Sequence, residues 1–339
     1  MPLPEVSWTR MAISGLQCMF RISAILVFLC LSGQARGWGF WGHQTINYHA
    51  VFLLPPDMLV FFKPHIEYLS AHAVDPDKRR YLLEQEGPRH YIDLDRYGPA
   101  PYYSLPRDWK TAVASCSEDT LQRYGIAPWW IQVMLERLTR SFAAKDPELI
   151  LKNAAELGHY IADIHVPLHA CSNHNGQNTG QHGIHGFWES RIPELLADKE
   201  WDFLIGQATY CKDPLDLAWN RVTQSAAASA TVLRTEKILR EQFDSDQVYA
   251  FEERNGKLVR QYSIAYTMAY DRLLGGMVER RMRESMEAVA SLWLTAWVNA
   301  GQPPLHSLSR QPITAENLLP LQELEEAYKN HPIKGREHD

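Results

Sequence analysis

Two pairs of potential metal ligands carry the clearest chemistry in this sequence. His159 and Asp163 are four residues apart in a segment of helical periodicity, so both side chains lie on one helix face and can reach the same ion. His185 and Glu189 repeat this spacing, and His169 lies between the two pairs. Imidazole and carboxylate ligands together suit zinc. One such pair is more typical of a helix surface, but two pairs and a further histidine in one short stretch predict a metal centre.

Asp75 and His90 form a weaker candidate pair, because fifteen residues separate them and many acidic residues and histidines are spaced in this way. The other predicted ligands make this pair more significant. A centre with several metal ions needs more ligands than the two helical pairs and His169 supply. We therefore include Asp75 and His90 among the predicted ligands.

The first 37 residues have the features of an export signal. Their apolar core, from Ile22 to Leu31, is shorter than the ~20 residues that span a bilayer. Ala35 and Gly37 then place small residues at the two positions that a signal peptidase reads. We predict export of a soluble protein after removal of residues 1–37, to the periplasm or the medium. A lipoprotein anchored through Cys30 is the alternative.

Cleavage after Gly37 would make Trp38 the first residue of the mature protein. A terminal amine and its carbonyl oxygen can chelate one metal ion, and His43 follows only five residues later. The new N-terminus is therefore a predicted part of the metal centre.

The composition sets limits on the class of protein. The net charge of −6 gives no basic field that would attract nucleic acid on its own. Cys116, Cys171 and Cys211 are the cysteines that remain after export, and three cysteines cannot all pair, so disulfides do not define this fold. The mature chain is long enough for one large domain with its own core.

The elements that must position the ligands are predicted to be helical. Asp146 and Pro147 have the types preferred at a helix N-cap and first helical position, and Pro167 should end the helix that they begin. The segment 262–300 is predicted to be one long helix. The proline-rich segment 95–109 is predicted to be a loop.

Strand patterns are scarce, and 252–256 is predicted to be a turn or a short irregular segment. The sequence therefore predicts an all-α fold, with a single compact domain over 38–304. The polar residues 305–339 are predicted to form a flexible tail.

The order of these ligand-type residues resembles that of the trinuclear-zinc phosphodiesterases, a superfamily that unites zinc-dependent phospholipase C with single-strand-specific nucleases. The resemblance extends from Trp38 to about Pro304 and implies a multi-helix domain of the phospholipase C and zinc nuclease type. It also implies three zinc ions per chain. The implied ligand sets are Asp75, His90, His159 and Asp163 for one zinc, Trp38, His43 and the bridging Asp163 for a second, and His169, His185 and Glu189 for a third.

The resemblance implies the reaction as well. A hydroxide bridging two zinc ions would attack phosphorus, because zinc lowers the pKa of bound water to about 7. The third zinc would stabilise the phosphate or the leaving oxygen. Asp75 is the expected catalytic residue, as a ligand and as the group that orients or deprotonates the water.

The substrate implied is single-stranded nucleic acid, with 3′-nucleotides as further substrates. Lys78 lies where the nucleases place a basic residue near the phosphate, and Tyr91 and Asp93 lie where they place a base-stacking ring and a base-reading carboxylate. Aromatic stacking holds bases of any sequence. No obligate protein partner is expected.

Two alternatives remain open at this point. Glu189 and the short interval between His169 and His185 agree better with the phospholipases, so a phosphatidylcholine-like head group is the alternative substrate. A binding protein that keeps structural zinc without catalysis is the other alternative. His165 and Cys171 lie among the ligands, but we predict structural roles for both.

Overall fold

The computed structural model describes residues 39–100, 102, 104–254, 256–308, 319–334 and 336. Two compact units are distinguished. One comprises Met1–Gln34 and Glu252–Val259, of which the structure describes only the tip of a β-hairpin. The other comprises Ala35–Phe251 and Arg260–Asp339 and holds every other described element. Trp38 and the export signal lie outside the described residues.

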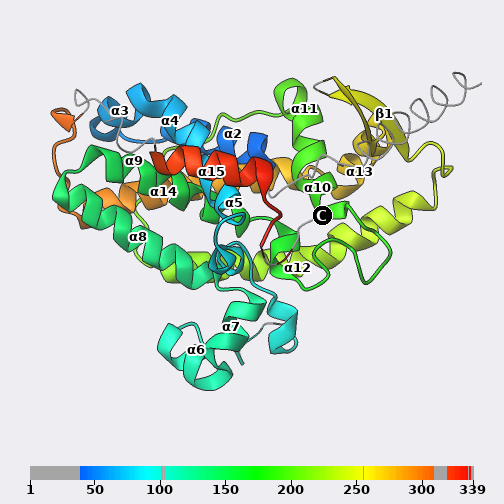
Figure 1. The fold of residues 1–339 in the computed structure, drawn as a ribbon, viewed down its shortest axis with the longest axis horizontal. Helices are drawn as coiled ribbons and strands as arrows, with labels where there is room; N and C mark the ends of the chain where they lie inside the picture. The colour runs from blue at the N-terminus through cyan, green and yellow to red at the C-terminus, as the bar shows by residue number, and fades with distance from the viewer. Residues whose placement is uncertain are drawn as a thin grey trace, which may run out of the picture. The chain divides into compact units, whose positions relative to one another are not determined.

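The described chain is almost entirely helical, which confirms the all-α prediction (Figure 1). The helices are α2 (Phe40–Val51), α3 (Pro56–Phe62), α4 (Ile66–Ala71), α5 (Asp75–Arg79), α6 (Trp109–Cys116), α7 (Glu118–Tyr124), α8 (Ala127–Ala144), α9 (Pro147–Asp163), α10 (Ile184–Gly186), α11 (Ile192–Glu200), α12 (Pro214–Arg240), α13 (Ile264–Leu274), α14 (Met277–Asn299) and α15 (Leu319–Asn330). The hairpin consists of β1 (Tyr249–Arg254) and β2 (Lys257–Tyr262).

Shorter helical turns connect these elements. They are η2 (Lys63–His65), η3 (His72–Val74), η4 (Glu84–Arg89), η5 (Leu94–Tyr97), η6 (Pro167–Ala170) and the π-helical turn η7 (Phe187–Arg191). None of the helices in the described part of the chain is long and apolar enough to cross a membrane.

Helix α9 is buried along most of its length and begins as predicted. The side chain of Asp146 accepts hydrogen bonds from the backbone N–H groups of Glu148 (3.1 Å) and Leu149 (3.0 Å), and Pro147 occupies the first helical position. The helix packs against α2, α8 and α14 and ends at Asp163, before Pro167 (Figure 1). Both metal-ligand candidates on α9 therefore lie in its last, buried turns.

Helices α2 and α9 approach each other closely at Gly158. A Cβ atom at this position would lie 2.0 Å from Oδ1 of Asn47, so no larger residue fits there without displacement. Asn47 in turn donates hydrogen bonds to the carbonyl oxygens of Ala155 and Leu69, both at 3.0 Å. This contact brings the N-terminal helix against the ligand-bearing turns of α9.

The prediction of one long helix over 262–300 is wrong. Tyr262 ends β2, and Gly275 and Gly276 separate α13 from α14 with φ angles of +62° and +70°. Glycine adopts this left-handed conformation without the steric cost that other residues incur, and it commonly ends helices in this way. The hydrophobic periodicity continues across the break, which is why the pattern alone suggested a single helix.

The region predicted to be a flexible tail contains α15, which packs along α5 (Figure 1). Leu324 and Ala327 are buried, and the Tyr328 ring lies 5.3 Å from the ring of Phe40. These residues, three and four apart, form a narrow apolar stripe on an otherwise polar helix. The overall polarity of the segment concealed this stripe.

Candidate metal centre

Three groups of buried side chains in the described residues are arranged so that each could hold a metal ion. Within each group, one potential ligand atom per residue lies within 4.8 Å of the others. The groups are His43, His159 and Asp163, then Asp77, His90 and His159, and finally His169, His185 and Glu189. All of these residues are almost completely buried.

Asp163 and His159 link the first two groups. Oδ1 of Asp163 faces Nε2 of His43 at 3.5 Å, whereas Oδ2 lies 3.0 Å from Nδ1 of His90 and 3.2 Å from Nε2 of His159. The rings of His43 and His159 are stacked with centroids 3.8 Å apart. The carboxylate therefore has one oxygen directed toward each group, as a carboxylate shared by two ions requires.

The third group is built from η6 and the turns around η7. Nε2 of His185 lies 3.0 Å from Oε2 of Glu189 and 3.1 Å from Nε2 of His169. Asn175 Oδ1 accepts the backbone N–H of Gly183 at 2.8 Å and holds the preceding loop against this turn. Glu189 lies in a π-helical turn, a feature often found at functional sites.

The donor set fits a cation, because backbone carbonyl groups hold the N–H of three histidines. Nδ1 of His159 donates to Ala73 O (2.8 Å), Nδ1 of His169 to His90 O (2.7 Å) and Nδ1 of His185 to His174 O (3.1 Å). With this tautomer, each neutral ring directs the lone pair of Nε2 into the site. Metal-binding histidines are oriented by this kind of hydrogen bond. In each group, these lone pairs meet a carboxylate, so the arrangement favours a positive ion between them.

Burial and charge perturb the protonation of these groups. Burial lowers the pKa of His185 to about 3 and raises the pKa of Glu189 to about 8. Burial also opposes protonation of His159, but Asp163 and Asp77 outweigh it and raise the pKa to about 9. Without a metal ion, the site therefore attracts protons to Glu189 and to His159, whereas, despite burial, the neighbouring histidines keep the pKa values of Asp77 and Asp163 below their usual range. A bound cation would replace these protons.

The structure differs from the prediction at Asp75. Oδ2 of Asp75 lies 2.8 Å from Nδ1 of His72, whereas Oδ1 of Asp77 lies 3.7 Å from Nδ1 of His90 and 3.8 Å from Nε2 of His159. Residues two apart on a helix point in directions about 200° apart, so the two carboxylates face opposite sides of α5. The spacing in the sequence suggested Asp75 and missed Asp77. The sequence alone does not decide between these two carboxylates, because the choice depends on the rotation of α5 about its axis.

Glu86 is another residue that the sequence did not indicate. It is fully buried, lies 3.7 Å from Nε2 of His90 and accepts a hydrogen bond from Arg89 at 2.6 Å. Arg79 also pairs with it, and Tyr160 donates to it. Burial opposes ionisation, but His90, Arg79 and Arg89 keep the pKa of Glu86 well below its usual value. The ionised carboxylate of Glu86 therefore lies beside Nε2 of His90, where it helps to orient this ring.

Lys78, Tyr91 and Asp93, the predicted substrate-binding residues, all contact the C-terminal segment. Lys78 pairs with Glu325 of α15. Asp93 forms an ion pair with Arg336 at 2.7 Å, and the Arg336 guanidinium lies 4.0 Å from the centroid of the Tyr91 ring. Arg336 was not predicted to take part in the site.

The remaining predictions concern structural residues. Cys171 and His165 are buried, and Nδ1 of His165 donates to Ile161 O at 2.7 Å. Burial lowers the pKa of His165 to about 3 and raises that of Cys171 to about 12, so neither group ionises near neutral pH. Neither belongs to a metal group among the described residues.

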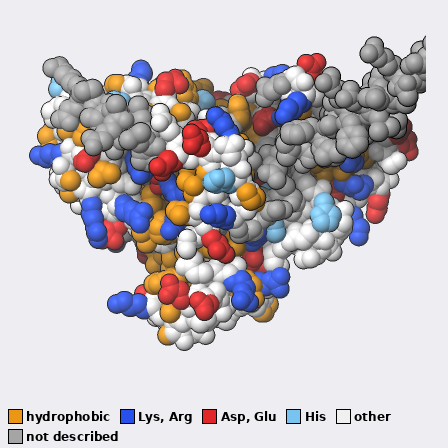
Figure 2. All heavy atoms as spheres, viewed as in Figure 1, with side chains coloured by type: hydrophobic (Ala, Val, Ile, Leu, Met, Phe, Trp, Pro, Cys, Tyr) orange, Lys and Arg blue, Asp and Glu red, His pale blue; other side chains and the backbone are white. Residues whose placement is uncertain are grey.

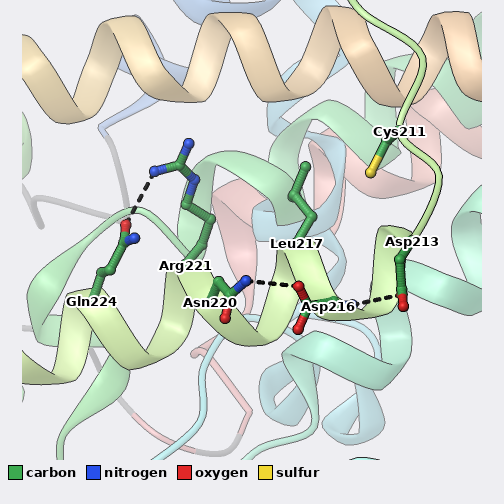
Figure 3. A pocket seen from close by; sticks show the side chains of 7 residues that line it. All are labelled: Cys211, Asp213, Asp216, Leu217, Asn220, Arg221 and Gln224. Carbon is green, nitrogen blue, oxygen red and sulfur yellow. Dashed lines mark hydrogen bonds between the residues drawn. The ribbon is translucent and has the colours of Figure 1, made fainter.

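A surface pocket of about 400 Å³ lies along the first half of α12 and contains none of the candidate ligands (Figure 3). Its polar side chains bond within the pocket. Arg221 donates to Gln224 at 3.0 Å, and Asn220 donates to Asp216 at 2.8 Å. These internal bonds give no indication of a ligand.

Comparison with known proteins agrees with this geometry. The model of the S1/P1 Nuclease family matches residues 38–285, a stretch that includes every candidate ligand. Nuclease S1 of Aspergillus oryzae is 27% identical over 186 residues, which cover 50% of this chain and 59% of that protein. The chain thus spans about three fifths of the length of this curated relative. Because the family match covers well over half of its residues, the chain belongs to the S1/P1 nuclease family.

Proposed function

We propose that this protein is an exported zinc-dependent phosphodiesterase that hydrolyses single-stranded nucleic acid. The observation that carries the proposal is the convergence of histidine lone pairs and carboxylates in three buried groups, two of them linked by Asp163 and His159. Membership of the S1/P1 nuclease family supports the same chemistry.

In this proposal, three zinc ions are bound per chain. Asp77, His90, His159 and Asp163 would hold one, His43 and Asp163 would hold a second with the terminal amine and carbonyl of Trp38, and His169, His185 and Glu189 would hold the third. Zinc would supply a Lewis acid for the phosphate and lower the pKa of water at the site. Asp77 replaces Asp75 as the proposed ligand.

The protein's own residues orient the reactants. Asp77 Oδ2 is buried and makes no hydrogen bond within the described residues, so it is free to accept a proton or a hydrogen bond from the attacking water. The carbonyl oxygens behind His159, His169 and His185 prevent these rings from turning. Lys78, next to Asp77 in the sequence, is the proposed phosphate-binding cation, and a phosphate would have to displace Glu325 from its ammonium group.

Base recognition is assigned to Tyr91 and Asp93, which directly follow His90. The Tyr91 ring would stack on a base, and Asp93 would accept hydrogen bonds from its edge. Positive and negative side chains are interspersed on the face shown in Figure 2, and the sequence carries a net charge of −6. We therefore expect the metal centre and this subsite, rather than a basic surface, to hold the substrate.

A phospholipid head group is the second candidate substrate, because Glu189 completes the third group where the nucleases use aspartate. The test is a parallel assay of the zinc-loaded protein against single-stranded DNA, RNA, 3′-nucleotides and phosphatidylcholine vesicles. We expect cleavage of the single-stranded nucleic acids, with 3′-nucleotides as slower substrates. Cleavage of phosphatidylcholine alone would reject the nuclease function. Three tightly bound zinc ions without hydrolysis of any substrate would support a binding protein.

The proposed N-terminal ligand requires removal of residues 1–37. A protein that retains one extra residue before Trp38 should bind one zinc fewer and lose most activity, since its amine is displaced from the site. Zinc content by mass spectrometry and N-terminal sequencing of the same sample measure this effect. Full zinc content in the extended protein would exclude a terminal ligand.

A further inference from the structure

The C-terminal segment, by which we mean α15 and the described residues 331–334 and 336, is anchored beside the proposed substrate site. Tyr328 packs between Phe40 and Tyr81, with ring centroids 5.3 Å and 5.4 Å away. Glu325 pairs with Lys78. Helix α15 is thus fixed to α2 and α5, the helices that carry His43 and Asp77.

Beyond α15, the segment follows the backbone after α5. The N–H of Lys334 donates to Arg80 O at 2.9 Å, and Nζ of Lys334 donates to Leu82 O at 2.8 Å. The guanidinium of Arg80 donates to the backbone oxygen of Arg336. These bonds direct the Arg336 side chain toward Tyr91 and Asp93.

The Arg336 side chain lies inside the proposed base subsite. Its Nη1 donates to Oδ1 of Asp93 at 2.7 Å, and its Nη2 donates to Cys171 O at 3.3 Å. The guanidinium plane lies over the Tyr91 ring, 4.0 Å from its centroid. Side chains of Arg336 and Asp93 are only 14% and 9% exposed, so the contact displaces water.

A guanidinium group and a nucleobase can make the same contacts with Tyr91 and Asp93. Both are planar, both stack on an aromatic ring, and both can donate N–H groups to a carboxylate. The N1–H and amino edge of guanine is the closest match, because it presents two parallel donors. A base cannot stack on Tyr91 and bond to Asp93 while Arg336 holds the same positions.

We propose that Arg336 is an internal competitor of the nucleobase and that the end of the C-terminal segment must withdraw before a base binds. The inference rests on the proposed nuclease function. Since α15 is fixed separately by Tyr328 and Glu325, only the residues after it need to move. The apparent affinity for a nucleotide is then the intrinsic affinity reduced by the fraction of molecules in which the subsite is open.

The test compares Arg336→Ala with the native sequence in the full mature, zinc-loaded protein. Binding of 2′-deoxyguanosine 5′-monophosphate is measured by titration calorimetry, and kcat and KM are measured with a single-stranded oligonucleotide. If the subsite is open in about a tenth of the molecules, the substitution should tighten nucleotide binding and lower KM by about tenfold, with kcat unchanged. Unchanged or weaker binding would overturn the proposal, and weaker binding would make Arg336 a substrate ligand.

Lys329→Ala is the matched control, because it removes one exposed positive charge from the same segment and leaves the pair between Glu325 and Lys78 in place. It should leave binding and KM unaltered. Thermal melting establishes that each variant is folded. Lys334→Ala loosens the segment without altering the subsite, so it should tighten nucleotide binding by a smaller factor even if Arg336→Ala fails to fold.

Free guanidinium ion provides an independent readout. At low millimolar concentration it should compete with the nucleotide in Arg336→Ala and compete about tenfold more weakly in the native protein, whose own guanidinium fills the subsite in most molecules. Competition of equal strength in both proteins would overturn the proposal. Oligonucleotide cleavage that is identical in both proteins would reject the competitor alone, whereas absence of nucleotide binding and cleavage in every variant would reject the nuclease function as well.

Discussion

The metal groups and the proposed base subsite are neighbours in the sequence but are built differently. The metal ligands are buried around α9, and backbone carbonyl groups accept the Nδ1–H of His159, His169 and His185. Tyr91 and Asp93 contact Arg336, which is more than 240 residues away in the chain (243 from Asp93). Withdrawal of the C-terminal residues would open the base subsite and leave the hydrogen bonds that orient His159, His169 and His185 in place.

Because of this difference, we expect the two regions to control different properties, namely the chemical step and the affinity for substrate. A rigid metal centre lets the chemistry depend on fixed distances, because its ligands cannot rotate away from the ion. A subsite that is filled by the protein's own side chain makes affinity depend on an equilibrium between closed and open states. Substitutions in the first region should therefore change metal content and stability, and substitutions in the second should change substrate affinity.

The largest effect is expected from Asp163→Asn. The substitution preserves shape but removes the charge that faces His43, His90 and His159, so two of the three groups lose their shared ligand. Zinc content should fall to about one per chain and activity by more than about a hundredfold, exceeding the usual effect of a supporting residue. Asp198→Asn, the same change at an exposed position, is the control. Normal zinc content in Asp163→Asn would show that the centre is wrongly assigned.

Asp77→Asn and Asp75→Asn compare the two carboxylates of α5. Asp77 faces His90 and His159, so its substitution should remove one zinc and most activity. Asp75 pairs with His72, so Asp75→Asn should retain all zinc and most activity. Metal analysis of the two variants, purified in parallel, measures the difference. The reverse outcome would restore Asp75 as the ligand and require a different rotation of α5.

The third prediction concerns pH and Glu189. Burial raises its pKa from 4.5 to about 8, so in the metal-free protein the folded state binds this proton more tightly than the unfolded state. Its contribution to stability is complete below pH 4.5 and is lost as the pH rises through 8. Zinc binding should reverse the trend, because the ion stabilises the ionised carboxylate and releases the proton.

Thermal melting of metal-free and zinc-loaded protein between pH 5 and pH 8.5 would measure this effect. Glu189→Gln cannot titrate, so it should melt with a weaker dependence on pH than the native metal-free protein. Equal pH dependence in both metal-free proteins would assign the titration to another group.

The smallest effect on activity is expected from Gly158→Ala, which tests how the core positions the ligands. The added Cβ would meet Asn47 Oδ1 at 2.0 Å and push α2 away from α9. Overpacking of this kind costs about 1–3 kcal/mol in the free energy of unfolding. Gly206→Ala is the control, since nothing lies within 4 Å of its added Cβ. Thermal melting should show a lower midpoint for Gly158→Ala alone, with weaker binding of the zinc that His43 holds.

Features that depend on local spacing were predictable from the sequence. Four-residue intervals placed His159 with Asp163 and His185 with Glu189, and Asp146 with Pro147 marked the start of α9, because helix geometry and capping are local properties. The tertiary structure alone decided which carboxylate of α5 meets His90, that Gly275 and Gly276 divide a continuous apolar pattern, and that Arg336 reaches Tyr91 and Asp93. These outcomes depend on the rotation of a short helix, on backbone conformation and on packing between distant segments, none of which a local pattern encodes.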